Sequence, residues 1–164
     1  MVAGAPKPRS YGVVLASLIV AFMLAAVPLP DWVNAWRPAW VAMVLIYWCI
    51  ALPERVGVGT AWIVGLFLDG LTGSLLGLHA AGLAIVAYIA ASVHQRIRLF
   101  PLGQQALLVG VILAVYLSFT LWVRFVQGTS GPNPTMLLPA LSSMLLWPWL
   151  FIILRDLRRK FRVT

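Results

Sequence analysis

The chain has 164 residues, of which 62% are hydrophobic and 10% are charged, and its 12 basic and 4 acidic residues give a formal net charge of +8. An average soluble domain is about 25% charged, so a chain this apolar could not cover its surface in water. Intrinsic disorder is excluded as well, because disordered chains are poor in apolar residues. The composition therefore predicts an integral membrane protein with one domain.

The charge-poor segments predict a bundle of six membrane-spanning helices. A helix needs roughly 20 residues to cross the hydrocarbon core, and residues 56–95 are too many for one crossing. The breaker-rich stretch DGLTGSLLG, residues 69–77, divides this segment into two short helices joined by a turn. Residues 1–164 thus form one all-α transmembrane domain that ends in a short basic tail at 155–164. The expected spans are residues 11–29, 38–53, 57–70, 77–95, 101–124 and 136–154.

The first apolar run follows Lys7 and Arg9, as the apolar part of a signal peptide would. It is longer than the usual length of about 7–15 residues, and no A-x-A cleavage site precedes Pro28. We therefore expect this run to be retained as the first helix.

The basic residues predict the orientation of the bundle, because loops rich in Lys and Arg stay in the cytoplasm. With the N-terminus inside, only Arg37 and Arg124 face outward. The basic residues that face inward are Lys7, Arg9, Arg55, Arg96, Arg98, Arg155, Arg158, Arg159, Lys160 and Arg162. An even number of helices keeps both termini in the cytoplasm.

Small residues recur at every fourth position along the helix predicted at 57–70 and the turn after it. They are Gly57, Ala61, Gly65, Asp69, Gly73 and Gly77. Positions four apart lie on one face of a helix, and a face of small residues lets two membrane helices approach closely. Gly73 and Gly77 fall near the turn, so the face itself is formed by the first four. This face either packs on a helix of the same chain or receives a helix of another chain.

Asp69 is a carboxylate inside a membrane span, which is costly and indicates a function. Three interpretations stay open. Asp69 caps the turn at residues 71–77 through backbone hydrogen bonds, forms a buried ion pair with Arg124 or Arg37, or contacts a ligand or partner. His79, at the start of the next predicted helix, is a further candidate partner.

The residue pattern does not predict an enzyme, a metal site or a cofactor. His79 and His94 fall at opposite ends of one predicted helix, roughly 22 Å apart, and Cys49 stands alone within an apolar run. The remaining carboxylates are scattered over both membrane faces, at Asp31, Glu54 and Asp156. The basic residues also lack a domain that would organise them to read nucleic acid.

The sequence after the last span, LRDLRRKFRVT, is strongly basic. Its basic residues are Arg155, Arg158, Arg159, Lys160 and Arg162, and Arg96 and Arg98 lie at the same predicted membrane face. These side chains either anchor the protein on anionic headgroups, at about 1 kcal/mol per residue, or form a docking surface for a cytoplasmic protein.

Four stretches resemble the bacterial rod shape-determining protein MreD family: RPAWVAMVLIYWCIALPERVG, GVGTAWIVGLFLDGLTGSLLGLHA, YIAASVHQRIRLFPLGQQA and LLPALSSMLLWPWLFIILRDLRRKF. The resemblance runs from Arg37 to Phe161. It implies a fold of six helices similar to the substrate-binding S components of vitamin transporters, placed in the bacterial inner membrane. The family motif falls on Gly65, Asp69, Gly73, Gly77 and His79.

The resemblance also implies a function and partners. The chain would be a non-catalytic scaffold subunit of the cell-elongation complex that binds the bitopic protein MreC directly. MreB, RodA and its penicillin-binding transpeptidase would belong to the wider complex, with membrane lipids and a second copy of the chain as further partners.

The alternative function is small-molecule binding of the S-component type, in a pocket that opens outward near Asp69. Few polar residues are available to line such a pocket, which favours the scaffold. They are Asp69, Ser74, His79, Ser118, Thr120, Ser142 and Ser143.

Overall fold

The computed structural model describes residues 8–129, 131 and 133–163, and these residues form helices joined by short turns. The helices are α1 (Pro8–Ala26), α2 (Asp31–Asn34), α3 (Trp40–Ala51), α4 (Val58–Thr72), α5 (Leu78–Leu99), α6 (Leu102–Val126), the 3₁₀ helix η1 (Pro134–Leu137) and α7 (Leu138–Lys160). Each of the six expected spans corresponds to one of these helices. Lys7, which contributes to the predicted orientation, lies outside the described residues.

The helix ends differ from the expected spans where the local chemistry favours another end point. α1 stops at Ala26 because Pro28 and Pro30 follow, and a proline restricts the residue before it to extended conformations. α5 and α7 run past their expected ends through the basic residues Arg96, Arg98, Arg158, Arg159 and Lys160. Cations in the last turn of a helix are stabilised by the helix dipole. The four-residue helix α2 was not expected.

Three of the helices are long and apolar enough to cross a membrane: α5, α6 and the segment Pro134–Lys160. Three shorter apolar helices accompany them, over Tyr11–Ala26, Trp40–Ala51 and Val58–Thr72. With 12 residues, α3 is roughly 18 Å long, less than the ~30 Å of the hydrocarbon core. This short length is tolerated because α3 is buried on all sides from Val41 to Ala51. Such a helix meets protein rather than lipid.

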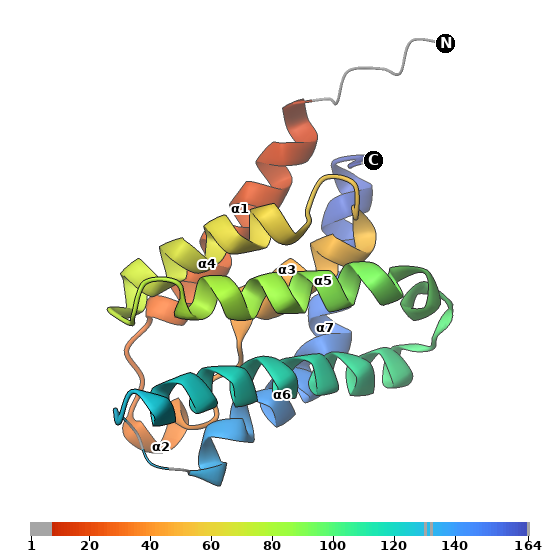
Figure 1. The fold of residues 1–164 in the computed structure, drawn as a ribbon. Coiled ribbons are helices and arrows are strands. Elements are labelled where there is room, and N and C mark those ends of the chain that lie inside the picture. Colours follow the sequence, from red (N-terminus) through yellow and green to blue (C-terminus); the bar gives the residue numbers. More distant parts are fainter. Residues whose placement is uncertain (1–7, 130, 132, 164) are drawn as a thin grey trace.

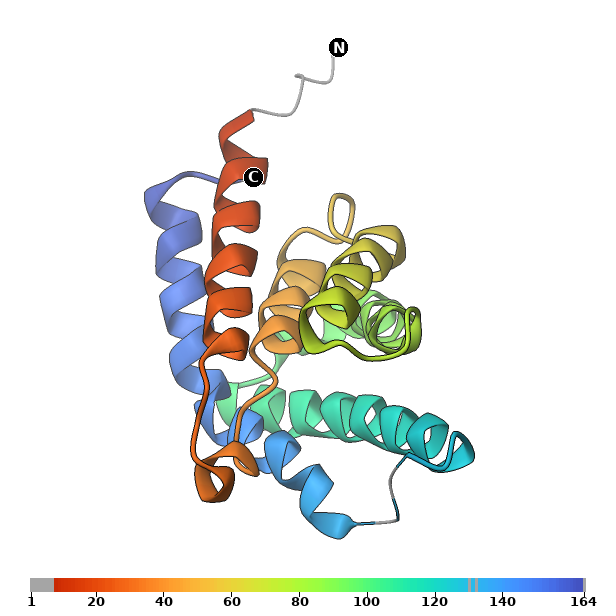
Figure 2. The same cartoon turned by 90° about the vertical axis from the view of Figure 1, so that its left-hand side faces the viewer.

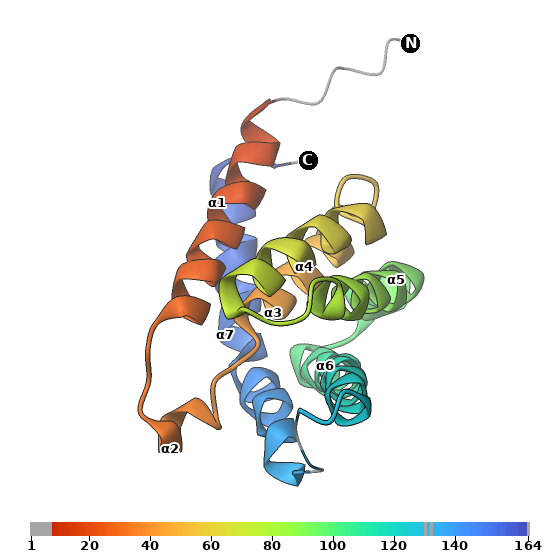
Figure 3. The ribbon, with the colours of Figure 1, turned by 60° about the vertical axis from the view of Figure 1, so that its left-hand side comes forward.

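The buried helix α3 forms the centre of the bundle and contacts α1, α5, α6 and α7. Figures 2 and 3 show α1 and α7 on one side of α3, and α4 and α5 on the other. α6 packs on both α5 and α7 and so closes the bundle between them. α4 packs mainly on α5, which leaves it at the edge.

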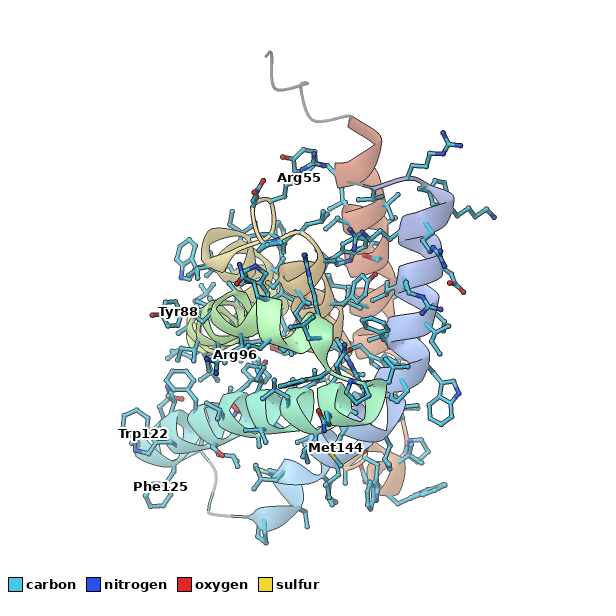
Figure 4. The ribbon with its side chains drawn as sticks, turned by 90° about the vertical axis from the view of Figure 1, so that its right-hand side faces the viewer. Arg55, Tyr88, Arg96, Trp122, Phe125 and Met144 are labelled. Carbon is cyan, nitrogen blue, oxygen red and sulfur yellow. The ribbon has the colours of Figure 1, made fainter. Side chains whose placement is uncertain are left out.

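The turns gather at two opposite ends of the molecule (Figure 1). We call the one with residues 27–39, 73–77, 127–129 and 133–137 the hairpin end, and the one with the start of α1 and the end of α7 the terminal end. In Figure 4, Trp122 and Phe125 project outward near the hairpin end, whereas Arg55 lies near the start of α1. The Arg55 guanidinium is 5.6 Å from the centre of the Tyr11 ring at that terminal end.

Three glycines allow close contacts between successive helices. Their neighbours are Ala80 for Gly65, Tyr116 for Gly82 and Met144 for Gly110. An added Cβ would lie 2.2 Å from the Ala80 Cα, 2.7 Å from the Tyr116 Cε2 and 3.0 Å from the Met144 Sδ. The contacts join α4 to α5, α5 to α6 and α6 to α7. Small residues at such crossings are what membrane helices use to gain close van der Waals contact.

Candidate functional site

Asp69, in the last turn of α4, is 1% exposed and forms the centre of a buried hydrogen-bond cluster. Its Oδ1 accepts hydrogen bonds from the Ser74 hydroxyl at 2.9 Å and from the His79 backbone N–H at 2.9 Å. Its Oδ2 accepts from the backbone N–H of Gly77 at 2.8 Å and, more weakly, from that of Ala80 at 3.4 Å. The His79 Nδ1 lies 2.7 Å from Oδ1. We call these residues the Asp69 cluster.

The Asp69 cluster caps the amino-terminal end of α5 from the neighbouring helix. The first N–H groups of any helix lack partners within the helix, and a carboxylate there is stabilised by the helix dipole. The turn itself requires glycine, because Gly73 has a φ of 66° and Gly77 a φ of 100°. A side chain with a Cβ is disfavoured at such angles. Gly73 and Gly77, the last two of the small residues at every fourth position, therefore form the turn.

His79 is fixed by the same carboxylate. A carboxylate only accepts hydrogen bonds, so we assign the proton of the close contact to the His79 Nδ1. The centre of the imidazole ring is 6.2 Å from that of the Tyr116 ring. The assigned tautomer leaves Nε2 as a hydrogen-bond acceptor, and His79 also lines a cavity at this end of the bundle.

These contacts agree with the interpretation of Asp69 as a cap. Arg37, one of the two arginines considered as its ion-pair partner, donates instead to the backbone carbonyls of Ala25 and Val27 at the end of α1. Among the described residues, Asp69 forms its salt bridge with His79 and with neither Arg37 nor Arg124. Asp69 is therefore a capping carboxylate with a histidine neighbour, and the alternative of an ion pair with Arg124 or Arg37 is not formed among the described residues.

The face of small residues on α4 packs on α5 of the same chain. Ala61 is fully buried, and Gly65 leaves no room for a Cβ beside Ala80. Gly57 precedes the helix as its half-buried N-cap. The internal-packing interpretation therefore describes this face, and a helix of another chain could reach Gly65 only by displacing α5.

The basic residues predicted to meet the membrane surface lie on the last turns of α5 and α7 and just beyond α7. Arg98 is partly engaged, because it donates to the carbonyls of Ile50 at 2.6 Å and Ala51 at 3.0 Å and so caps the end of α3. Arg158 donates to the Val163 carbonyl at 3.3 Å. The exposed members of the set are Arg96, Arg98, Arg155, Arg159, Lys160 and Arg162.

A polar cavity of about 330 Å³ at the hairpin end contains residues that the sequence alone did not bring together. Its polar lining residues are Asn34, His79, Tyr116, Thr120, Arg124 and Thr135. Of the polar residues expected around a pocket, it includes His79 and Thr120, whereas Ser118, Ser142 and Ser143 lie elsewhere. One signal was present in the sequence: Tyr116, Thr120 and Arg124 are spaced by four and therefore share one face of α6.

Long apolar helices around a buried core, with a carboxylate that caps a helix inside the bundle, define a multi-pass helical membrane protein. In the part of the chain that the structure describes, no group of three or more His, Cys, Asp or Glu residues forms a metal site.

Comparison with known proteins identifies the family. The family model of the rod shape-determining protein MreD matches residues 9–157. The chain is also 35% identical to the rod shape-determining protein MreD of Haemophilus influenzae over 150 residues, which is 92% of this chain and 93% of that protein. The chain belongs to the MreD family, whose members are non-catalytic determinants of rod shape. No solved structure matches it.

Proposed function

We propose that this chain is a membrane scaffold of the rod complex that holds the transmembrane helix of MreC. Membership in the MreD family supports a place in that complex. MreC then connects the chain to MreB, RodA and the penicillin-binding transpeptidase. The observation that carries the proposal is the position of α4, which packs mainly on α5 and leaves the large side chains Trp62, Ile63 and Phe67 exposed.

The outward face of α4 has the shape that a partner helix needs. Gly59, Ile63, Phe67 and Gly70 lie along it, spaced by three or four residues, so they share one side of the helix. Ile63 and Phe67 are exposed, and a Cβ at Gly59 or Gly70 would meet no other atom within 4 Å. Two exposed glycines flanking large side chains allow close helix packing. The Asp69 cluster holds this face in place before a partner arrives, which reduces the cost of binding.

Leucine substitutions on this face test the proposal. Gly59→Leu and Gly70→Leu should leave the fold intact because both positions have open space. The matched control is Gly12→Leu, which fills an equally open position on α1. We expect each α4 variant to reduce co-purification of MreC from membranes at least about tenfold, equivalent to 1.4 kcal/mol. Wild-type recovery of MreC with both α4 variants would rule out this face as the interface.

The same proposal puts the protein in the bacterial inner membrane, with its terminal end facing the cytoplasm. Its support is the set of exposed basic residues on the ends of α5 and α7, because cytoplasmic segments are enriched in Lys and Arg. These side chains anchor that end on anionic headgroups.

Thiol labelling tests the orientation with little background, because the single cysteine, Cys49, is buried. Arg162→Cys reports on the terminal end, and Thr129→Cys reports on the hairpin end. In intact spheroplasts, an impermeant maleimide should label Thr129→Cys but not Arg162→Cys. The reverse pattern would overturn the orientation.

A further inference from the structure

The polar cavity is built mainly from hydrogen-bond donors. Arg124 offers a guanidinium with five N–H groups, and Asn34 offers an amide. Tyr116 adds a hydroxyl, whereas the His79 Nε2 is an acceptor in the assigned tautomer. Asp69, which contacts the lining residue His79, is not itself among the lining residues and already accepts hydrogen bonds within its cluster. The lining therefore suits a ligand that is rich in acceptors.

Tyr116 indicates that a polar partner belongs in this cavity. The residue is only 5% exposed, yet its hydroxyl makes no hydrogen bond with any described residue. The hydroxyl is the accessible part of this side chain, and in the cavity it can donate to a ligand. Arg124 likewise forms no ion pair among the described residues. Both side chains line the cavity, where a bound anion would pair with them.

The side chains that line the polar cavity are held in place by residues outside it. Gly82 leaves room for the Tyr116 ring, which could not lie where it does if residue 82 carried a Cβ. Asp69 fixes the His79 ring through Nδ1. Tyr116 and Arg124 lie on one face of α6, two helical turns apart. A site whose donors are positioned before binding loses less entropy when the ligand arrives.

We propose that this cavity binds a phosphate group at the hairpin end of the bundle. Arg124 pairs with the phosphate through its planar fork, while Tyr116 and Asn34 donate hydrogen bonds from other directions. A volume of about 330 Å³ accommodates a group of this size with its immediate substituent. The phosphate comes either from free solute or from a phospholipid headgroup. The proposal is independent of MreC binding, because the cavity and the outward face of α4 share no residue.

An apolar cavity of about 460 Å³ shares the lining residue Leu121 with the polar cavity. Trp122, Phe125 and Leu137 line it, and it offers space for the acyl chain of a lipid whose headgroup occupies the polar cavity. A free phosphate would leave this second cavity unused.

Binding measurements on the purified, delipidated full chain distinguish the two sources. The probes are inorganic phosphate and a short-chain phosphatidylglycerol, each titrated and followed by native mass spectrometry. Binding of both means that the phosphate alone is sufficient, and binding of the lipid alone assigns the site to a headgroup. Failure of both probes to bind overturns the proposal.

Two substitutions connect binding to this cavity. Arg124→Gln should weaken the affinity for the binding probe at least tenfold, and Arg124→Lys should weaken it less because the charge remains. Tyr116→Phe keeps the ring on Gly82 and removes only the hydroxyl, so it should fold normally and weaken binding severalfold. Its matched control is Tyr88→Phe, since Tyr88 is exposed on α5 and points away from the bundle (Figure 4). Equal binding by Arg124→Gln, Tyr116→Phe and the control would show that the probe binds elsewhere and would overturn the proposal.

Discussion

The hairpin of α4 and α5 and the pair of α6 and α7 are held together in different ways. In the hairpin, Gly65 brings the backbones of the two helices into contact at Ala80, and the Asp69 cluster connects them through hydrogen bonds. The α6–α7 pair meets through a side chain, because Met144 covers Gly110. Two apolar cavities of about 340 and 400 Å³ lie along this second contact.

The difference shows how a membrane bundle can combine a fixed part with an adaptable one. Lipid tails are as apolar as the helices, so association depends on close packing and on hydrogen bonds. The hairpin of α4 and α5 is held by close packing and by hydrogen bonds, so substitutions at its contacts should be strongly destabilising. A methionine contact beside open space can readjust, since Met is flexible and fills irregular gaps. Substitutions in the two regions should therefore have effects of different size.

The largest effect should come from Gly65→Ala. The new Cβ would lie 2.2 Å from the Ala80 Cα, and backbone cannot rotate away as a side chain can. The two helices must separate, at a cost of about 3 kcal/mol. We expect a large drop in the thermal unfolding midpoint in detergent. Gly59→Ala on the open side of the same helix is the control and should be neutral or slightly stabilising. Equal midpoints for the two variants would contradict the tight backbone contact.

Asp69→Ala should have the next largest effect, because it leaves the N–H groups of Gly77 and His79 without their acceptor. We expect a loss of about 2 kcal/mol in the free energy of unfolding. Asp69→Asn keeps one acceptor oxygen and should cost about half as much. Denaturant titration of the purified variants measures both. If Asn behaves like the wild type, the negative charge contributes nothing to the cap.

Gly82→Ala tests the boundary between the two regions, where α5 meets α6. The added Cβ would lie 2.7 Å from the Tyr116 Cε2, and the ring must move to avoid it. We expect a loss of about 1.5 kcal/mol. A double-mutant cycle with Tyr116→Ala measures the coupling directly, because removal of the ring should abolish most of this loss. Additive effects would show that the Tyr116 ring is not the cause of the stability lost in Gly82→Ala.

The same two regions show which features sequence reasoning could reach. The hairpin was predictable because its signals are local: residues 69–77 mark the turn, and Asp69 caps residues that follow within eleven positions. The helix ends differed from the expected spans, but the prolines and basic residues that account for them are also local. Both features depend on neighbours in sequence, which a single chain displays directly.

Contacts between segments that are distant in the sequence could not be predicted from such local signals. Hydropathy reports that a segment lies in the membrane but not which helix it packs against. The polar cavity combines residues of α2, α5, α6, η1 and α7, and only the spacing of Tyr116, Thr120 and Arg124 indicated it. For the same reason, the sequence did not reveal that Arg37 caps α1 and Arg98 caps α3.

The smallest effect should come from Gly110→Ala, at the α6–α7 contact. Its Cβ would lie 3.0 Å from the Met144 Sδ and 3.3 Å from the Met144 Cβ. The thioether can turn into the cavity that Met144 itself lines, so we expect a loss below about 1 kcal/mol. The replacement of glycine within a helix by alanine offsets part of this loss. Met144→Leu should change little as well, because the cavity accommodates either side chain. A loss in Gly110→Ala as large as that in Gly65→Ala would mean that α6 and α7 are as rigidly joined as the hairpin, and the contrast between the two regions would fail.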